Sequence, residues 1–322
     1  MLAVTATRFD RADPLAALSV GDHADPDPGE GWTTVRVRAA ALNHHDLWTL
    51  RGVGITEDRL PIVLGCDAAG VDEDGNEVVV HAVIGDPAAG GGDETLDPRR
   101  SLLSERHDGT FAEALAVPRR NLVPKPAALS FEEAACLPTA WLTAYRMLFT
   151  KSGLRPGGRV LVQGAGGGVA TAAVVLASRA GLHVTVTSRD PAKRRRALEL
   201  GAHEALEPGA RLPERVDAVL ETVGKATWDH SLKALRPGGT LVVAGATSGY
   251  DPPADLSRVF FLQLSVVGST MGTRAELEQL IRFCAVTGVR PIVDETMPLA
   301  EARRGFARMA EGELFGKIVF TV

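Results

Sequence analysis

Cysteine is scarce in this chain, and its distribution excludes two kinds of site. The 322 residues contain three cysteines, Cys66, Cys136 and Cys284, which stand far apart. Because an odd and scattered set does not form the disulfide framework of a small secreted domain, we expect a reducing compartment. A structural zinc site built from four thiolates is excluded by the count alone.

Long apolar runs and an excess of basic charge are also missing. No apolar stretch approaches the roughly 20 residues that span a bilayer, and the N-terminal residues 1–5 lead into a predicted strand rather than a secretory leader. We therefore expect a cytoplasmic protein with no membrane partner. Aromatic residues make up 5 % of the chain and the formal net charge is −5, which argues against a nucleic-acid surface.

A cluster of glycines organises the middle of the chain. The apolar run 159–163 leads into Gly164, Gly166, Gly167 and Gly168, and small residues from Val169 onward predict a helix. A strand, a glycine turn and a helix N-terminus are typical of a site that cradles a pyrophosphate. The turn can be aligned at Gly164 or one residue later, and both alignments place the backbone N–H groups of Gly167 to Val169 at the phosphates. We interpret it as a nicotinamide dinucleotide site.

The pattern of predicted elements changes near residue 130. Before it, strands are expected at 3–9, 33–39, 77–83 and 111–117, with an exposed and mobile loop at 85–106. The capping box at Ser130 predicts a helix start, and strands then alternate with helices, as in a doubly wound parallel sheet. A strand-like segment at 256–268 and terminal strands follow. The return to strands suggests that the C-terminal tail packs on the first domain.

Several further motifs occur in an order and spacing typical of one family. They are Ala41-Leu-Asn-His-His-Asp-Leu-Trp48, Arg51-Gly52, Leu60-Pro-Ile-Val-Leu-Gly-Cys-Asp-Ala-Ala-Gly70, Asp108-Gly-Thr-Phe-Ala-Glu113, Leu137-Pro-Thr-Ala-Trp-Leu-Thr-Ala-Tyr145, Leu200-Gly-Ala202, Arg236-Pro-Gly-Gly239 and Gly316-Lys-Ile-Val319. With the glycine turn, they resemble the medium-chain dehydrogenase/reductase superfamily over essentially the whole chain, and most closely its quinone oxidoreductase branch. The resemblance implies an α/β protein: a GroES-like, β-rich catalytic domain formed by residues 1–127 together with 266–322, and a Rossmann domain of residues 128–265.

The resemblance also implies where a catalytic zinc would be held. Zinc-dependent members have a cysteine at the position of Asn43, a histidine at Cys66, and a cysteine or aspartate at or near Thr139. Because a catalytic zinc needs three good donors, this set predicts a zinc-free enzyme. His44, His45 and His81 are further metal donors by type, but scattered histidines are more often solvated or hydrogen-bonded.

The end of the second Rossmann strand indicates which nicotinamide cofactor binds. NAD-selective sites place a carboxylate there to bind the ribose 2′-hydroxyl. This chain has Ser188 and Arg189, followed one helical turn later by Lys193. A hydroxyl and two cations suit a 2′-phosphate, so we expect NADPH. Asp190 is better explained as the cap of the next helix.

The remaining site residues follow from the resemblance. Three catalytic-domain residues are expected near the reaction: Asn43 as an amide donor or a turn residue, His45 as a proton donor or a solvated side chain, and Asp46 as the group that orders the loop. Further cofactor contacts are expected at Thr143, Gly245, Ser269, Met271 and Lys317.

These features predict an NADPH-dependent oxidoreductase that transfers hydride directly to a quinone or an α,β-unsaturated carbonyl, small molecules that need no metal to accept it. Two alternatives stay open: an alcohol dehydrogenase or carbonyl reductase of the same superfamily, and an NADPH-binding protein with little turnover. Specificity is expected to come from loops at 45–60, 85–108 and 245–270. The segment 256–268 is expected to pair across a homodimer, as the resemblance suggests.

Overall fold

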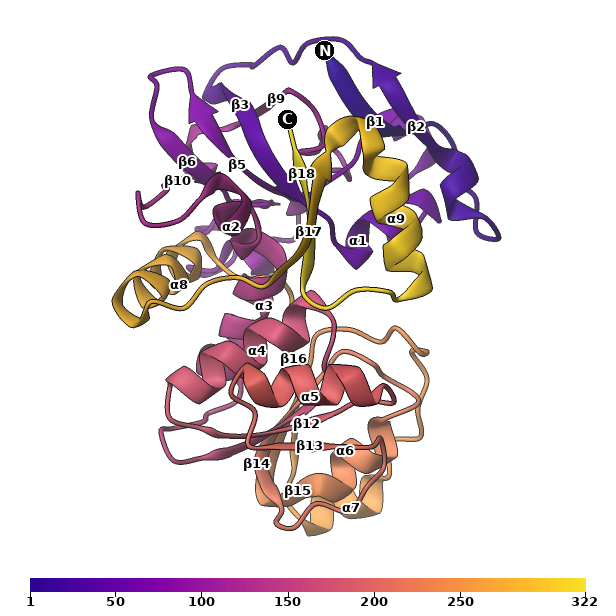
Figure 1. The fold of residues 1–322 in the computed structure, drawn as a ribbon, viewed down its shortest axis with the longest axis vertical. Coiled ribbons are helices and arrows are strands. Elements are labelled where there is room, and N and C mark those ends of the chain that lie inside the picture. Colours follow the sequence, from indigo (N-terminus) through magenta and orange to yellow (C-terminus); the bar gives the residue numbers. More distant parts are fainter. The chain divides into compact units, whose positions relative to one another are not determined.

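The computed structural model describes all 322 residues, which form two compact units (Figure 1). One unit comprises Met1–Leu142 and Met271–Val322, and the other comprises Thr143–Thr270. The expected division placed residues 128–142 in the Rossmann domain, whereas the structure groups them with the β-rich unit. The reason is that helix α2 (Phe131–Ala135) packs on strands β3 (Trp32–Ala41) and β5 (Asp67–Asp72). No helix is both long enough and apolar enough to cross a membrane.

Both ends of the chain build the β-rich unit. Its main sheet has the order β10-β6-β5-β3-β18-β17, with β9 also paired to β3. The C-terminal strand β18 (Lys317–Thr321) pairs antiparallel with β3, so the tail does return to the first domain, as predicted. The other strands of this sheet are β6 (Glu77–Val80), β9 (Ala114–Pro118), β10 (Leu122–Pro124) and β17 (Val293–Pro298).

Smaller sheets and four helices complete this unit. One sheet has the order β2-β1-β4, and the other pairs β7 with β8. Three phenylalanines, Phe111, Phe306 and Phe320, contact one another in the apolar core. The remaining strands and helices of this unit have these bounds: β1 (Leu2–Ala6), β2 (Leu18–Asp22), β4 (Ile62–Val63), β7 (Val83–Ile84), β8 (Ser101–Leu102), α1 (His44–Leu50), α8 (Arg274–Thr287) and α9 (Ala302–Glu311).

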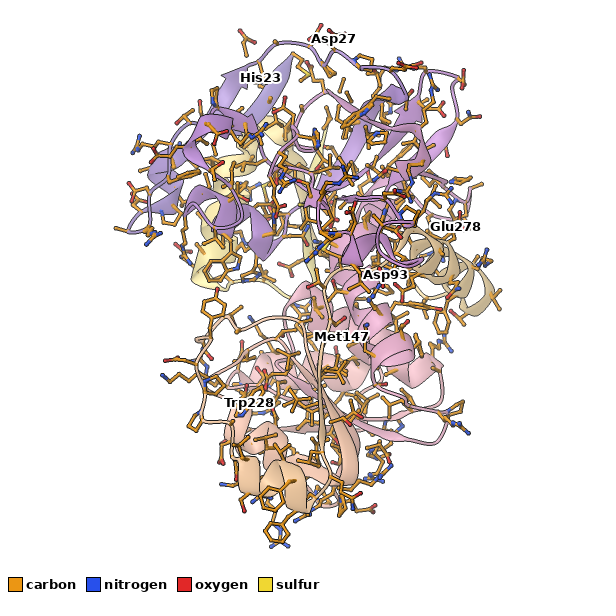
Figure 2. The ribbon with its side chains drawn as sticks, turned by 180° about the vertical axis from the view of Figure 1, so that it is seen from behind. His23, Asp27, Asp93, Met147, Trp228 and Glu278 are labelled. Atoms are coloured by element: carbon orange, nitrogen blue, oxygen red, sulfur yellow. The ribbon has the colours of Figure 1, made fainter.

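The second unit is a Rossmann-like sheet of six parallel strands in the order β13-β12-β11-β14-β15-β16. Its strands are β11 (Arg159–Gln163), β12 (His183–Thr187), β13 (Glu204–Leu206), β14 (Val216–Glu221), β15 (Leu235–Val243) and β16 (Ser265–Gly268). Its helices are α4 (Gly168–Arg179), α5 (Pro191–Glu199), α6 (Trp228–Ala234) and α7 (Leu256–Phe261), preceded by the helical segment 142–151. Trp228 of α6 packs against the core of this unit (Figure 2). The expected fold class, GroES-like plus Rossmann, is therefore confirmed.

Two expectations about local structure were wrong in part. The segment 85–106 is an exposed loop only in part: Asp86, Gly91 and Arg99 are exposed, as expected. Glu94 and Asp97, by contrast, are buried, because neighbouring backbone N–H groups satisfy their carboxylates, as Arg274 N does for Glu94 at 2.7 Å. The segment 256–268 is not one strand either. Its first half is helix α7, which Asp255 caps through Arg258 N, and only its end forms β16.

Candidate active site

The start of α1 is held by a reciprocal pair of polar contacts. Asn43 is the N-cap residue, and the Asp46 carboxylate accepts a hydrogen bond from the Asn43 backbone N–H at 2.8 Å. The Asn43 side-chain amide donates to the Ala41 carbonyl at 3.1 Å and to the Asp67 carboxylate at 2.8 Å. Asp46 therefore orders the loop, as the sequence predicted.

Lys317 completes this network from strand β18. Its buried ammonium group donates to the Leu42 carbonyl at 2.7 Å, to the Asn43 side-chain oxygen and to Asp67 Oδ2 at 3.2 Å. An ammonium group has three protons, and these acceptors use all of them. In this arrangement both side chains position α1 and β5, and the expected roles of Asn43 toward cofactor or substrate and of Lys317 toward cofactor stay predictions.

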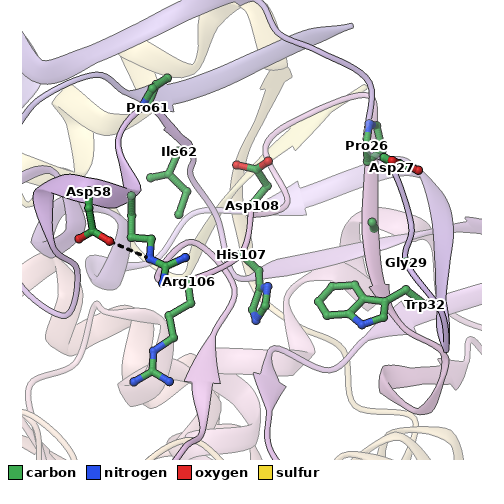
Figure 3. Close-up of a pocket in the computed structure, with 12 residues that line it drawn as sticks. Pro26, Asp27, Gly29, Trp32, Asp58, Pro61, Ile62, Arg106, His107 and Asp108 are labelled. Carbon is green, nitrogen blue, oxygen red and sulfur yellow. Dashed lines mark ion pairs between the residues drawn. The ribbon is translucent and has the colours of Figure 1, made fainter.

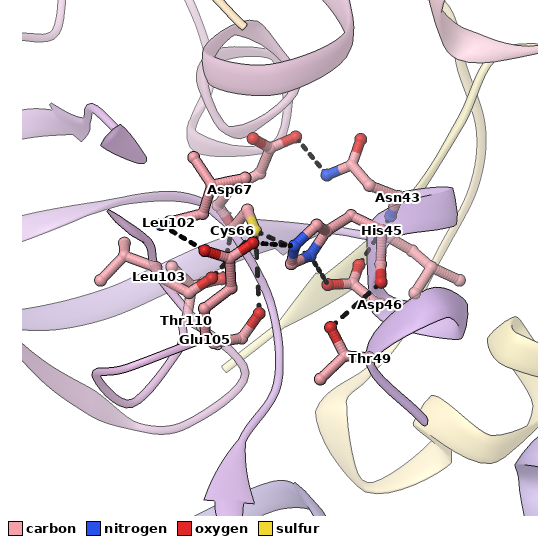
Figure 4. A network of polar contacts seen from close by, with 12 residues as sticks. Asn43, His45, Asp46, Thr49, Cys66, Asp67, Leu102, Leu103, Glu105 and Thr110 are labelled. Atoms are coloured by element: carbon pink, nitrogen blue, oxygen red, sulfur yellow. Dashed lines mark hydrogen bonds and ion pairs between the residues drawn. The ribbon is translucent and has the colours of Figure 1, made fainter. Parts of the chain in front are cut away.

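His45 lies at the centre of a second network in the same unit (Figure 4). Its Nδ1 is 3.3 Å from Cys66 Sγ, and its Nε2 is 3.2 Å from a carboxylate oxygen of Glu105. Burial acts to lower the pKa of His45, but the Cys66 sulfur and the carboxylates of Asp46 and Glu105 outweigh it and hold this pKa well above its usual value. Burial raises the pKa of the Cys66 thiol. Both ring nitrogens of His45 have partners, and its role as a proton donor stays a prediction.

The residues at the three zinc-ligand positions do not fit that metal. Both ends of the Asn43 amide are occupied by Lys317, Asp67 and Ala41, and Thr139 offers a neutral hydroxyl. Cys66 is then the one good donor of the three, and a catalytic zinc requires three. These positions do not support a step through zinc.

The Rossmann unit presents its glycine turn at the carboxyl ends of the strands. Gly164 has a φ of +89°, which favours glycine, and Gly167 is the N-cap of α4. A side chain built at Gly167 would meet no atom within 4 Å, so the space beside the helix N-terminus is open. The strand order reverses at β11, and ligands of such sheets bind at that point. The turn fits a dinucleotide phosphate.

A buried carboxylate that the sequence analysis missed ties these strand ends together. Glu221, the last residue of β14, accepts hydrogen bonds from the N–H groups of Val223 and Gly224 and from the hydroxyls of Thr227 and Ser231. Ser231 in turn accepts from Gln163 at the end of β11, and Gln163 accepts from Thr187 at the end of β12 at 2.7 Å. The network fixes three strand ends at the cofactor edge.

The residues expected to select the cofactor gather at the end of β12. Asp190 accepts from Ala192 N at 2.7 Å and caps α5, as predicted. The Ser188 hydroxyl accepts from Asp190 N at 3.2 Å, Arg189 is exposed, and Lys193 is in the first turn of α5. No carboxylate other than the capping Asp190 follows the strand directly.

The remaining predicted cofactor residues differ in their surroundings. Ser269 is buried, and its hydroxyl has no hydrogen-bond partner, which leaves it available to a bound group. Thr143 is buried in the helical segment before β11. Gly245 follows β15 in the same unit, whereas Met271 belongs to the β-rich unit and has a φ of +50°.

A separate pocket of about 520 Å³ opens on the β-rich unit (Figure 3). The rings of Trp32 and His107 lie 5.0 Å apart at its wall. Its charged lining residues are Arg59, Arg106, Asp27, Asp58 and Asp108. Since the carboxylates outnumber the guanidinium groups, the pocket offers no excess positive charge for a phosphate.

Comparison with known proteins identifies the family. Residues 29–127 match the alcohol dehydrogenase GroES-like domain, and residues 168–286 match the zinc-binding dehydrogenase domain. The chain is 30 % identical to an alcohol dehydrogenase from Geobacillus stearothermophilus, over 95 % of this chain and 96 % of that protein. The chain belongs to the medium-chain dehydrogenase/reductase superfamily.

Two other members of the superfamily illustrate its range. An acryloyl-coenzyme A reductase from Metallosphaera sedula is 30 % identical over 92 % of this chain and 94 % of that protein. A crystal structure of an NAD-dependent alcohol dehydrogenase is 36 % identical, with a TM-score of 0.91 and full coverage of both chains. The superfamily is thus confirmed, while membership of its quinone oxidoreductase branch stays a prediction.

Proposed function

We propose that the protein is an NADPH-dependent oxidoreductase that reduces an α,β-unsaturated carbonyl compound without zinc. One observation carries this proposal: at the zinc-ligand positions the Asn43 amide is fully bonded to Ala41, Asp67 and Lys317. A site without a Lewis acid needs a substrate that is already electron-poor at carbon, and a conjugated carbonyl is one. The similarity to an acryloyl-coenzyme A reductase supports this class, and the similarity to alcohol dehydrogenases supports the carbonyl alternative. A quinone is a second acceptor of the same chemistry.

The Rossmann unit supplies the groups for the cofactor. The open space at Gly167 and the N-terminus of α4 suit the pyrophosphate. The Ser188 hydroxyl and the cations Arg189 and Lys193 suit the 2′-phosphate of NADPH, and the unpartnered Ser269 hydroxyl suits a polar group of the cofactor. When bound, NADPH supplies a hydride to the β-carbon of the acceptor, and the α-carbon then takes a proton.

The β-rich unit positions groups for this chemistry rather than reacting itself. Asn43, Asp46 and Lys317 hold the start of α1 in place, and His45 is fixed between Cys66 and Glu105. Because both ring nitrogens of His45 have partners, we propose that water provides the proton. Orientation and exclusion of bulk water then account for most of the rate.

Parallel assays with NADPH test the proposal. Protein treated with EDTA is mixed with an enone, benzoquinone and an unconjugated ketone, and oxidation of NADPH is followed by absorbance. Turnover of the enone with slower or no reaction of the ketone is expected. Preference for the unconjugated ketone would support the alcohol dehydrogenase alternative, and binding of NADPH without turnover of any acceptor would support the non-catalytic one.

We also propose that the protein forms a homodimer through β16. This strand is at the edge of its sheet, and Val266 is 47 % exposed. Helix α7 exposes Phe260 and Phe261 in the same unit. An unprotected edge strand with exposed apolar neighbours favours pairing with a second copy. Light scattering on the wild-type protein and on Val266→Lys tests this: a dimer that dissociates in the variant is expected.

A further inference from the structure

Three different kinds of metal donor converge beside helix α1. The Nδ1 atom of His45 is 3.3 Å from Cys66 Sγ and 3.9 Å from Asp46 Oδ1, and the three donor atoms lie within 4.8 Å of one another (Figure 4). A thiolate, an imidazole and a carboxylate are the ligand types that zinc prefers. This set shares only Cys66 with the positions that hold catalytic zinc in the superfamily.

Asp46 has a buried carboxylate oxygen without a hydrogen-bond donor. Its side chain is fully buried, and Oδ2 accepts the hydrogen bond from Asn43 N at 2.8 Å. Its other oxygen, Oδ1, is buried and accepts no hydrogen bond. A buried carboxylate oxygen without a donor is unfavourable, and a cation between it, His45 and Cys66 would satisfy it.

The spacing of these donors is close to what zinc requires. With Zn–S near 2.3 Å and Zn–N near 2.0 to 2.1 Å, a tetrahedral ion places its ligand atoms about 3.3 to 3.6 Å apart. The distance between His45 Nδ1 and Cys66 Sγ, 3.3 Å, is already close to this range, and that to Asp46 Oδ1, 3.9 Å, is slightly longer. The three donor atoms all lie within 4.8 Å of one another, so the Asp46 carboxylate has to move toward the other two donors for the ion to be bound.

Glu105 provides the outer partner that a ligating histidine usually has. Its Oε1 atom is 3.2 Å from His45 Nε2, and its Oε2 atom accepts from the Leu102 backbone N–H at 2.9 Å. A carboxylate on the far ring nitrogen fixes the ring orientation and keeps the proton at Nε2, so that Nδ1 and its present partner Cys66 Sγ can both bind an ion placed between them.

We propose that His45, Asp46 and Cys66 bind one zinc ion in a structural role. Cys66 and Asp46 are fully buried, and two further protein oxygens are close to the sulfur: the Leu103 carbonyl at 3.2 Å and the Ser104 hydroxyl at 3.8 Å. We take one of these two oxygens as the fourth ligand that a structural zinc centre needs. On binding, the Cys66 thiol and the His45 ring each release a proton to solvent, so that Sγ and Nδ1 can coordinate, and the ion joins α1 to the residue before β5. The inference goes beyond the proposed function, which uses no metal.

Cobalt spectroscopy tests the site without relying on activity. Cobalt(II) chloride is added to EDTA-treated wild-type protein and to the Cys66→Ser, His45→Gln and Cys284→Ser variants. Cys284 is a buried cysteine of α8 with no part in the cluster, so its variant is the matched control. One equivalent is expected to give a thiolate-to-cobalt charge-transfer band and tetrahedral visible bands in wild type and Cys284→Ser, and neither in the other two.

Zinc stoichiometry and thermal denaturation complete the test. One zinc per chain and a higher Tm with zinc are expected in wild type and Cys284→Ser, with at least a tenfold loss of affinity in Cys66→Ser and His45→Gln. No binding by wild type, or equal binding by Cys66→Ser, overturns the site. Cobalt bands that change when an enone is added overturn the structural role. Turnover of the EDTA-treated enzyme is a separate readout, so failure of the metal site leaves the proposed function intact.

Discussion

The ammonium group of Lys317 lies 3.2 Å from the Asp67 carboxylate, and both side chains are buried. The two residues are 250 positions apart in the chain and join β18 to β5. A buried pair of this kind holds its surroundings in one arrangement, but either charge alone is costly.

Lys317→Met should therefore destabilise the protein strongly. Removing the cation leaves Asp67 buried without its counter-charge, and the free energy of unfolding should fall by about 3 to 5 kcal/mol. Urea denaturation measures the change. The control is Lys233→Met, which removes an exposed ion pair with Asp229 and should cost less than about 1 kcal/mol. Similar losses in the two variants would contradict the role given to Lys317.

Ser188→Asp should change the cofactor preference. A carboxylate at the end of β12 repels a 2′-phosphate and accepts from a 2′-hydroxyl, so the Kd for NADPH should rise about 10- to 100-fold while that for NADH falls or stays the same. Fluorescence titration with both cofactors measures this. Arg195→Gln, at an exposed position on α5, is the control, because like Ser188→Asp it makes the net charge more negative by a single unit. Equal weakening by both variants would show only a general effect of charge.

Glu221→Gln should loosen the cofactor edge. In the wild type, N–H and O–H donors point at the Glu221 carboxylate. In the variant, one of its oxygens is replaced by an NH₂ group, which cannot accept these bonds, so the free energy of unfolding should fall by about 2 to 5 kcal/mol. Because Glu221 links to Gln163 and Thr187 through Ser231, NADPH binding should weaken as well. Glu214→Gln, at an exposed position, should change neither quantity. Unchanged stability in Glu221→Gln would contradict the role of this network in fixing the strand ends.

Thiol reactivity should be suppressed in the native state. Burial raises the pKa of Cys136 and of Cys284 to about 12. At pH 8 about one part in ten thousand of such a thiol is ionised, and at pH 10 about one part in a hundred, because the fraction rises tenfold per pH unit. A chromogenic disulfide reagent should react with these thiols at pH 8 only after the protein is unfolded in urea. Rapid labelling of either cysteine in native protein would show that the burial is wrong.

The parts of the fold that rest on local signals could be predicted from the sequence. The capping boxes at Ser130 and Thr273 start helices where expected, and Asp190 caps α5. The glycine turn leads from β11 into α4 as predicted. In each case the deciding contacts lie within a few residues of one another.

The site depends on contacts that local patterns do not encode. Glu105 is 60 residues from His45, within a segment whose charges suggested an exposed loop. Lys317 is predicted as a cofactor contact, and the sequence around it gives no sign of its bonds to Leu42, Asn43 and Asp67, which are about 250 or more positions away. Glu221 ends an apolar strand, and its own partners lie only 2 to 10 residues further along the chain. What the sequence does not show is the onward link from Ser231 to Gln163 and Thr187, which joins distant strand ends.

The most direct test of the central claim follows the transferred hydrogen itself. EDTA-treated protein is given NADPH deuterated at the transferable C4 position and a simple enone, and the product is analysed by mass spectrometry and NMR. The account predicts a saturated ketone with one deuterium at the β-carbon. An allylic alcohol with deuterium at the carbonyl carbon, or a reaction that begins only when zinc is restored, would contradict it and place the protein with the zinc-dependent alcohol dehydrogenases.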